Sequence, residues 1–214
     1  MTIFEDRIEA GERLAEALKA LAGPATVVLG IPRGGVIVGE VLARTLGAPL
    51  DVVVPRKIGA PDNPELGLGA VAPGVRVLDP WLIQRLGVSE DYLEREIAAQ
   101  EAETVRRLHT YRAGRPPVDL RGRTVIVVDD GVATGGTAVA ALRWARAQEA
   151  DTVVLAVPVA PPQTMERLRH EADTVVALAT PEPFFAVGEW YRRFDQTSDD
   201  EVVAALARAA GTTG

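Results

Sequence analysis

Between residues 124 and 179 the sequence repeats one pattern, in which a short apolar run rich in β-branched residues is followed by a segment of helical periodicity. The runs at 124–129, 152–158 and 174–179 are predicted strands, and the segments at 136–149 and 162–171 are predicted helices. Strands joined by crossover helices run parallel, and uniformly apolar strands are buried on both sides. The pattern therefore predicts an α/β fold with a parallel sheet and helices on both faces.

The sequence before this region has the same character. Predicted strands at 26–30 and 50–54 flank a predicted helix at 35–46, and an amphipathic helix is expected at 4–21. These elements add strands to the same sheet and a further helix to its surface.

The chain has 214 residues, the length of one α/β domain with an appendage, so we predict a single domain over residues 1–214. Its core is expected over about 24–60 and 118–180. An inserted loop and a long helix are expected over about 57–115, and an aromatic segment with a terminal helix over 181–210.

The insert begins with a stretch, 57–69, that holds too many glycine, proline and asparagine residues for a regular element. We predict a loop of about a dozen residues there, a length that is usually functional or mobile. A short strand is expected at 75–78. Ser89 is the predicted N-cap of a long polar helix that runs to about Ala113.

The composition narrows the classes of function. The formal net charge is −7, and nucleic acids and membrane surfaces attract surplus positive charge, so we expect neither as a partner. The absence of cysteine excludes disulfides, thiolate catalysis and cysteine-ligated metal. His109 and His170 show no metal-ligand spacing, and we predict no metal site built from protein side chains. The N-terminus has no apolar signal-peptide core and no apolar run is long enough to span a membrane, so we expect a cytoplasmic protein.

The segment 125–137 carries the functional prediction, because it joins a predicted buried strand to a helix through two aspartates and a loop of small residues. In parallel α/β sheets, ligands bind at the carboxyl ends of the strands, and the free N–H groups of a helix N-terminus attract anions. Glycines let the backbone wrap closely around a phosphate, and threonine hydroxyls add donors. The residues of this predicted phosphate loop are Gly131, Val132, Ala133, Thr134, Gly135, Gly136 and Thr137.

Asp129 and Asp130 precede the loop, and we call them the acidic pair. Carboxylates repel a phosphate but accept hydrogen bonds from sugar hydroxyls, so a phosphate site beside them predicts a ribose 5-phosphate. A P-loop would need a lysine where Thr137 stands, and the G-x-G-x-x-G dinucleotide fingerprint is absent. A plain strand-to-helix turn remains the alternative, and paired aspartates would be an unusual choice for it.

This run resembles the phosphoribosyl pyrophosphate (PRPP) signature of type I phosphoribosyltransferases, which is a hydrophobic strand, two acids and a small-residue loop ending Thr-Gly-x-Thr. The resemblance also covers 29–35, and the strand order spans most of 25–180. Within the family the chain most resembles uncharacterised bacterial members with a loop like 56–65 here. The resemblance implies a parallel-sheet phosphoribosyltransferase fold with a small hood or helical appendage. It also implies transfer of 5-phosphoribosyl from PRPP to a nucleobase or other small nitrogen nucleophile, with release of pyrophosphate.

The resemblance gives the acidic pair its predicted catalytic role of holding ribose hydroxyls and offsetting the positive charge of an oxocarbenium-like ribose. Mg²⁺ is the implied cofactor, held mainly by diphosphate, ribose hydroxyls and water. Members that act on 6-oxopurines usually carry a third acid where Ala133 stands, which weakens hypoxanthine and guanine as acceptors. The alternative is a non-catalytic sensor of PRPP or a nucleotide on the same fold.

A second loop, 31–35, again lies between a strand and a helix, and the resemblance places the pyrophosphate there, often with a non-proline cis peptide. Its predicted ligands are Arg33 and the amides of Gly34 and Gly35. Arg56 and Lys57 follow the next strand, and we expect them to add positive charge at the same edge of the sheet. Surface arginines and solvated charges are the alternatives at these positions.

Aromatic residues gather in 184–194. Nucleobases stack on aromatic faces, so Phe184, Phe185 and Trp190 are candidates for a base-binding hood. Packing of the C-terminal segment on the core, or a contact in a homodimer, explains them equally well. Glu65 is a further candidate for the base site, with a solvated loop charge as its alternative.

Overall fold

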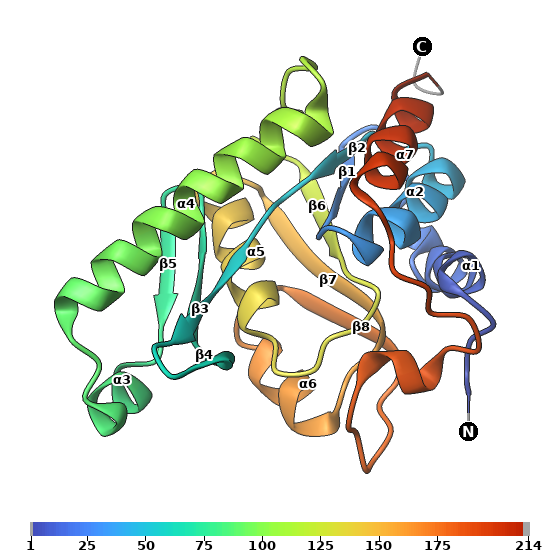
Figure 1. Cartoon of the computed structure of the whole chain (residues 1–214). Coiled ribbons are helices and arrows are strands. Elements are labelled where there is room, and N and C mark those ends of the chain that lie inside the picture. The colour runs from blue at the N-terminus through green and yellow to red at the C-terminus, as the bar shows by residue number, and fades with distance from the viewer. Residues whose placement is uncertain (1, 212–214) are drawn as a thin grey trace.

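The computed structural model describes residues 2–211, apart from the side chain of Glu65. At its centre is a five-stranded sheet in the order β2-β1-β6-β7-β8, and all of its strand pairs are parallel (Figure 1). This confirms the predicted parallel α/β architecture. The strands are β1 (Thr26–Gly30), β2 (Leu50–Val52), β6 (Thr124–Val128), β7 (Thr152–Val159) and β8 (Thr174–Ala179).

Helices cover both faces of this sheet, as predicted. Alternate residues along a strand point to opposite faces, so Val28 packs in one buried cluster and its neighbour Val27 in another. The first cluster contains residues of α1 (Arg7–Ala17), α2 (Gly34–Leu46) and α7 (Asp199–Gly211). The second contains residues of α5 (Gly136–Ala147) and α6 (Pro162–Leu168).

The prediction of a loop at 57–69 is wrong, because this stretch forms most of an antiparallel hairpin. The small second sheet has the order β3-β4-β5, with β3 (Arg56–Ala60), β4 (Asn63–Ala72) and β5 (Val75–Leu78). Its glycines serve close packing, since a Cβ on Gly59 would press on the Pro64 backbone and one on Gly69 on the Val77 carbonyl. Sequence reasoning read these glycines as breakers, although they allow the strands to approach.

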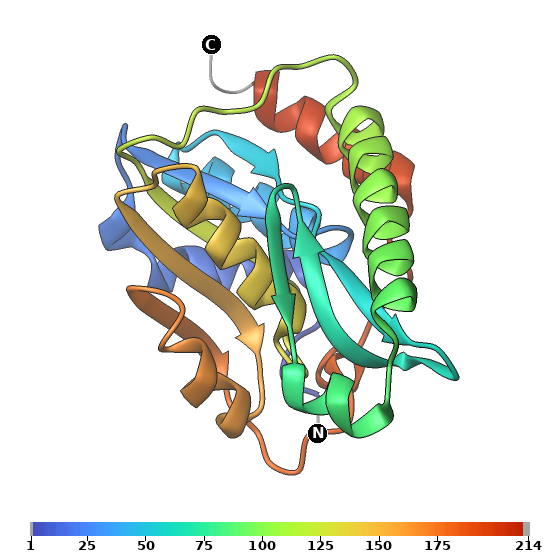
Figure 2. The same ribbon diagram turned by 90° about the vertical axis from the view of Figure 1, so that its left-hand side faces the viewer.

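The long helix α4 (Glu90–Arg112) lies alongside the small sheet (Figure 2). The Ser89 hydroxyl accepts a hydrogen bond from the Tyr92 N–H at 3.3 Å, which confirms the predicted N-cap. Ile97 is buried against Ile58 and Leu68, so α4 and the hairpin share a core of their own. A short helix before it, α3 (Pro80–Leu86), was not predicted.

The two ends of the chain pack together. The Ile3 and Phe4 N–H groups both donate to the Trp190 carbonyl at 2.9 Å, and the Phe4 and Tyr191 rings lie 5.3 Å apart. The segment before α7 contains a short 3₁₀ helix, η2 (Val187–Trp190), and another, η1 (Lys19–Leu21), follows α1. Helix α1 starts later than predicted because Asp6 caps it, accepting from the N–H groups of residues 8 and 9.

His109 and His170 are exposed. None of the helices within residues 2–211 has the length and apolar character needed to cross a membrane.

Candidate active site

Two glycine-containing loops leave neighbouring strands at the same edge of the main sheet. Strands β1 and β6 pair in parallel with Gly30 opposite Val128, and the Ile31 N–H donates to the Val128 carbonyl at 2.8 Å. The first loop, 31–35, runs into α2, and the second, 131–137, follows the acidic pair into α5. The structure thus brings both predicted anion sites to the carboxyl ends of adjacent strands.

The first loop lies directly against the acidic pair. A Cβ added to Gly34 would overlap the Asp130 carboxylate, and one added to Gly35 would press on the Val128 carbonyl and on Asp129. Glycine is therefore required at both positions by space. The resulting approach places the N-terminus of α2 beside both carboxylates.

The acidic pair is partly buried, and this raises the pKa of both carboxyl groups. Burial is the main cause at Asp129, whose pKa lies well above its ordinary value, and the neighbouring charge of Asp130 adds to it. Burial also raises the pKa of Asp130, while Arg7 opposes that shift. The Asp129 side chain accepts a hydrogen bond from the Asp130 N–H at 2.9 Å, which fixes the turn between them.

Arg7, from the first turn of α1, makes an ion pair with Asp130, the second residue of the acidic pair. Its Nε lies 2.7 Å from Oδ2 of Asp130, and both side chains are largely buried, at 13% and 14% exposed. The guanidinium also lies 3.9 Å from the Phe194 ring centroid and donates to the Asp195 carbonyl at 2.8 Å. The N-terminal helix and the C-terminal segment therefore both reach the site.

The second loop is built as an open helix N-terminus. Gly135 has φ 78°, a left-handed conformation that glycine adopts readily, and it precedes α5 without any side-chain cap. Helix α6 holds the loop from outside, since the Thr164 hydroxyl donates to the Ala133 carbonyl at 2.6 Å and Arg167 donates to the Thr134 carbonyl. The first N–H groups of α5 have no intrahelical partners and remain available for an anion.

Arg33 lies at the start of α2, and its peptide bond with Pro32 is cis. Its guanidinium is 3.8 Å from the Asp199 carboxylate at the start of α7, and its side chain is 32% exposed. The arginine is therefore held at the mouth of the site by the C-terminal helix.

Arg56 and Lys57 have surroundings that the sequence did not indicate. Arg56 donates from Nε to the Gln100 side chain of α4 at 2.9 Å, and burial lowers the pKa of its guanidinium. Lys57 is exposed on β3, with its aliphatic chain beside Gly67. Their predicted contact with a diphosphate stays a prediction.

The aromatic candidates divide into packed and exposed side chains. Phe184 stacks on Trp190 with ring centroids 6.0 Å apart, and both belong to the cluster that joins the chain ends. Phe185 is 78% exposed. Glu65 lies in β4, and its side chain is outside the described part of the structure.

A cavity of about 350 Å³ opens over these groups. It is lined by Arg7, Pro32, Arg33, Gly34, Asp129, Asp130, Phe194, Gln196 and Thr197. Within residues 2–211 there is no cluster of three or more His, Asp or Glu side chains placed to hold a metal ion. A divalent ion here would take most of its ligands from substrate oxygens and water.

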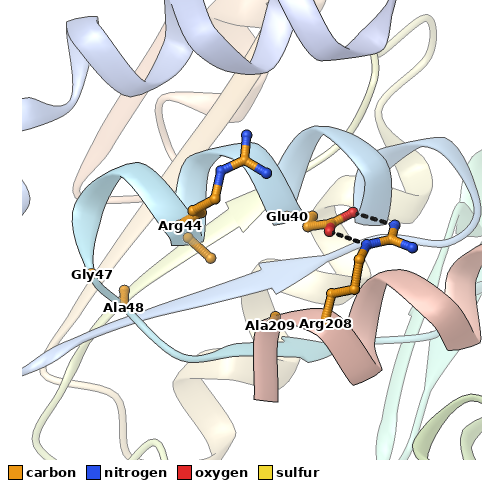
Figure 3. Close-up of a pocket in the computed structure, with 7 residues that line it drawn as sticks. Glu40, Arg44, Gly47, Ala48, Arg208 and Ala209 are labelled. Atoms are coloured by element: carbon orange, nitrogen blue, oxygen red, sulfur yellow. Dashed lines mark hydrogen bonds and ion pairs between the residues drawn. The ribbon is translucent and has the colours of Figure 1, made fainter. Parts of the chain in front are cut away.

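A second cavity of about 340 Å³ lies between α2 and α7 (Figure 3). A bidentate ion pair crosses it, with Arg208 Nε 2.6 Å from Glu40 Oε1. It shares no lining residue with the first cavity and lies towards the C-terminal end of α2, whereas the acidic pair is at the N-terminal end. The second cavity is therefore separate from the site of the acidic pair.

Sequence reasoning missed Arg7, Gln196 and Thr197 as site residues, and it missed the role of Phe194. The sequence did contain a signal for Arg7. The helix dipole disfavours an arginine in the first turn of a helix, so its presence there suggests a role outside the helix. For Gln196 and Thr197 the sequence offers no comparable signal, since their position depends on how the C-terminal segment folds back.

Known proteins resemble the chain over nearly all of its length. Rv0571c of Mycobacterium tuberculosis H37Rv, provisionally named a phosphoribosyl transferase, is 50% identical over 210 residues, which cover 98% of this chain and 47% of that protein. The chain thus spans about half the length of the curated relatives it matches. The crystal structure of TT1426 from Thermus thermophilus is 48% identical, with a TM-score of 0.82, and the match covers 97% of this chain and 99% of that one.

A shorter match, 35% identical over 140 residues, links the chain to the uracil phosphoribosyltransferase of Streptomyces coelicolor and covers 65% of this chain and 59% of that protein. The family model described as the phosphoribosyl transferase domain matches residues 3–192. This span contains the acidic pair and both loops, so the chain belongs to the phosphoribosyl transferase family.

Proposed function

We propose that this protein transfers a 5-phosphoribosyl group from PRPP to a small nitrogen nucleophile and releases pyrophosphate. One observation carries the proposal: two helix N-termini, those of α2 and α5, flank a single pair of partly buried carboxylates. A ligand that suits this arrangement has a phosphate group at each end and hydroxyls between them, and PRPP is such a molecule.

Each part of PRPP has a proposed set of ligands. The 5-phosphate binds to the loop 131–137 at the start of α5, where Ala133 and Thr134 are exposed. The ribose hydroxyls donate to Asp129 and Asp130. The diphosphate binds to Arg33 and to the amides of Gly34 and Gly35, with Arg56 and Lys57 contributing positive charge from β3.

The reaction breaks the bond between C1 of ribose and the diphosphate oxygen, and pyrophosphate leaves with the electron pair. The nitrogen nucleophile forms the new bond to C1 and gives up its proton to solvent water. The acidic pair opposes the positive charge that develops on the ribose ring, and Arg33 opposes the negative charge on the leaving diphosphate. Mg²⁺, bound to the diphosphate, would stabilise the leaving group further.

The acceptor is the open part of the proposal. Ala133 stands where 6-oxopurine enzymes carry an acid, which argues against hypoxanthine and guanine. The match to a uracil phosphoribosyltransferase adds a pyrimidine to the candidates. Phe184, Phe185, Trp190 and Glu65 remain the proposed base-site residues, and among the three aromatics Phe185 has the exposed ring that stacking requires.

The test is release of pyrophosphate from PRPP with Mg²⁺ across a panel of nucleobases and small amines. We expect release with one acceptor class and none when Asp129→Asn and Asp130→Asn are combined. Calorimetry of PRPP binding gives the second measurement, and equal affinity of the wild type and the double variant would show that the site is misplaced.

The second candidate is a sensor that binds PRPP without turning it over. Arg33 speaks against a nucleotide sensor that recognises only a 5-phosphate, because such a protein needs no cation at the other end of the site. Tight binding with no pyrophosphate release for any member of the panel would favour the sensor.

A further inference from the structure

We propose that Arg7 is a positioning residue, whose guanidinium holds the Asp130 carboxylate as an oriented hydrogen-bond acceptor for the ribose hydroxyls of the substrate. This inference rests on the proposed function and names a residue that the sequence motifs do not include. It also gives the N-terminal helix a role in the site.

The contact geometry is specific. Arg7 approaches Asp130 through Nε at 2.7 Å, with both side chains largely withdrawn from water. Tyr191 holds the same residue from its other side, because its hydroxyl donates to the Asp130 backbone carbonyl at 2.5 Å. Side chain and backbone of Asp130 are therefore each fixed by a separate donor.

Arg7 is itself held in place. Its guanidinium lies over the Phe194 ring at 3.9 Å and donates from Nη1 to the Asp195 carbonyl at 2.8 Å. Phe194 in turn packs so closely on Gly188 that a Cβ there would press on the ring. An arginine fixed by a ring, a carbonyl and a carboxylate has little freedom, which suits a residue that positions another.

The electrostatic need for Arg7 comes from the acidic pair. Two adjacent, partly buried carboxylates repel each other, and burial raises the pKa of both. A protonated Asp130 loses acceptor capacity for the ribose hydroxyls. The titratable and charged groups around Asp130 are Asp129, Arg7, Tyr191 and, across the cavity, Arg33. Of these, Arg7 is the cation in direct contact with the carboxylate.

The experiment measures the affinity for PRPP with Mg²⁺ by calorimetry between pH 5.5 and 8.5 in wild type, Arg7→Gln and Arg7→Lys. Without the cation, Asp130 takes up a proton at a higher pH, so Arg7→Gln should lose affinity on acidification about one pH unit earlier than wild type. At a pH below both midpoints, a shift of one pH unit corresponds to about tenfold weaker binding. Arg7→Lys retains the charge and should keep a midpoint close to that of wild type.

The matched control is Arg13→Gln. Arg13 lies on the same helix, stacks over Phe4 at 4.7 Å and pairs with Glu9, away from the acidic pair. Because the phosphates of PRPP titrate in the same pH range, only the difference between Arg7→Gln and this control counts. In an Asp130→Asn background, Arg7→Gln should no longer shift the midpoint.

The outcomes separate the two proposals. An unchanged pH midpoint in folded Arg7→Gln, or tighter binding at every pH, would overturn the role of Arg7 and leave the site assignment intact. If the Asp129→Asn, Asp130→Asn double variant also binds like wild type, the proposed function itself fails. If Arg7→Gln melts at too low a temperature for calorimetry, the comparison of Arg7→Lys with wild type decides. An unchanged midpoint in Arg7→Lys supports the role of the charge, whereas a shifted midpoint indicates a merely steric role for the arginine and overturns the proposal.

Discussion

The Tyr111 hydroxyl donates a 2.7 Å hydrogen bond to the Asp199 carboxylate and so joins the end of α4 to the first turn of α7. The same carboxylate lies 3.8 Å from the guanidinium of Arg33 in the first loop. One acid therefore connects the long helix, the terminal helix and the proposed diphosphate site. Helices α4 and α7, which lie in the two regions that the sequence placed outside the core, are thereby connected to the candidate active site.

Replacing Tyr111 by phenylalanine should destabilise the protein by about 1.5 kcal/mol, the usual cost of losing a hydrogen bond to a charged group. The ring is fully buried and stays in place, so no large cavity forms. Urea denaturation of Tyr111→Phe against wild type measures this difference. An unchanged free energy of unfolding would mean that water replaces the hydroxyl at no cost.

Gly34→Ala should abolish PRPP binding while the chain remains folded. The added methyl group would overlap the Asp130 carboxylate, so the first loop must move away from the acidic pair, at a cost of about 1–3 kcal/mol in stability. Gly23→Ala is the control, because a Cβ there meets nothing within 4 Å. Calorimetry with PRPP and thermal melting of both variants test this prediction. Normal PRPP binding by Gly34→Ala would contradict the close packing of the first loop against the acidic pair.

The sequence predicts the core of this fold well, because buried parallel strands and their crossover helices carry strong local patterns. Val27 and Val28 belong to a run whose every residue is buried, and such a run has few alternatives to a central strand. The positions of the acidic pair and the two loops at the ends of strands could be predicted for the same reason, because each lies within one continuous segment.

What the sequence did not show depends on contacts between distant segments. The stretch 57–69 was predicted to be a loop because Gly59 and Gly69 look like breakers until the neighbouring backbone is in place. Arg7 reaches Asp130 across 123 positions of sequence. The side chain of Arg56 donates to Gln100 of α4, 44 positions further along the chain. No local sequence pattern indicates these contacts between distant residues.

Arg112→Met should destabilise the protein by about 3–5 kcal/mol, because it leaves a buried carboxylate without its cation. Arg112 holds Asp51 through two hydrogen bonds of 3.0 and 3.1 Å, and the Asp51 side chain is only 7% exposed. The control is Arg106→Met, since Arg106 is 58% exposed and its pair with Glu103 is a surface contact worth at most about 1 kcal/mol. Equal losses in urea denaturation of the two variants would contradict this difference.

Asp129→Asn should stabilise the protein at pH 8 and weaken PRPP binding under the same conditions. Burial, and then the charge of Asp130, raise the pKa of Asp129, so the folded chain binds this proton more tightly than the unfolded chain. The carboxyl therefore contributes stability at low pH that is lost as the pH rises through its folded-state pKa. Asparagine carries no charge at any pH, and its side-chain oxygen can still accept from the Asp130 N–H.

We expect the variant to melt about 2–4 °C above wild type at pH 8, the shift that roughly 1 kcal/mol gives in a chain of this size. The melting temperatures of the two proteins should converge below about pH 3, where the carboxyl is protonated in both the folded and the unfolded wild type. Asp119→Asn, at an exposed aspartate, should show no such pH-dependent gain. A variant that is less stable than wild type at pH 8 would mean that the Asp129 charge supports the fold. The predicted result would instead show that the charge of Asp129 lowers the stability of the fold and serves the binding of PRPP.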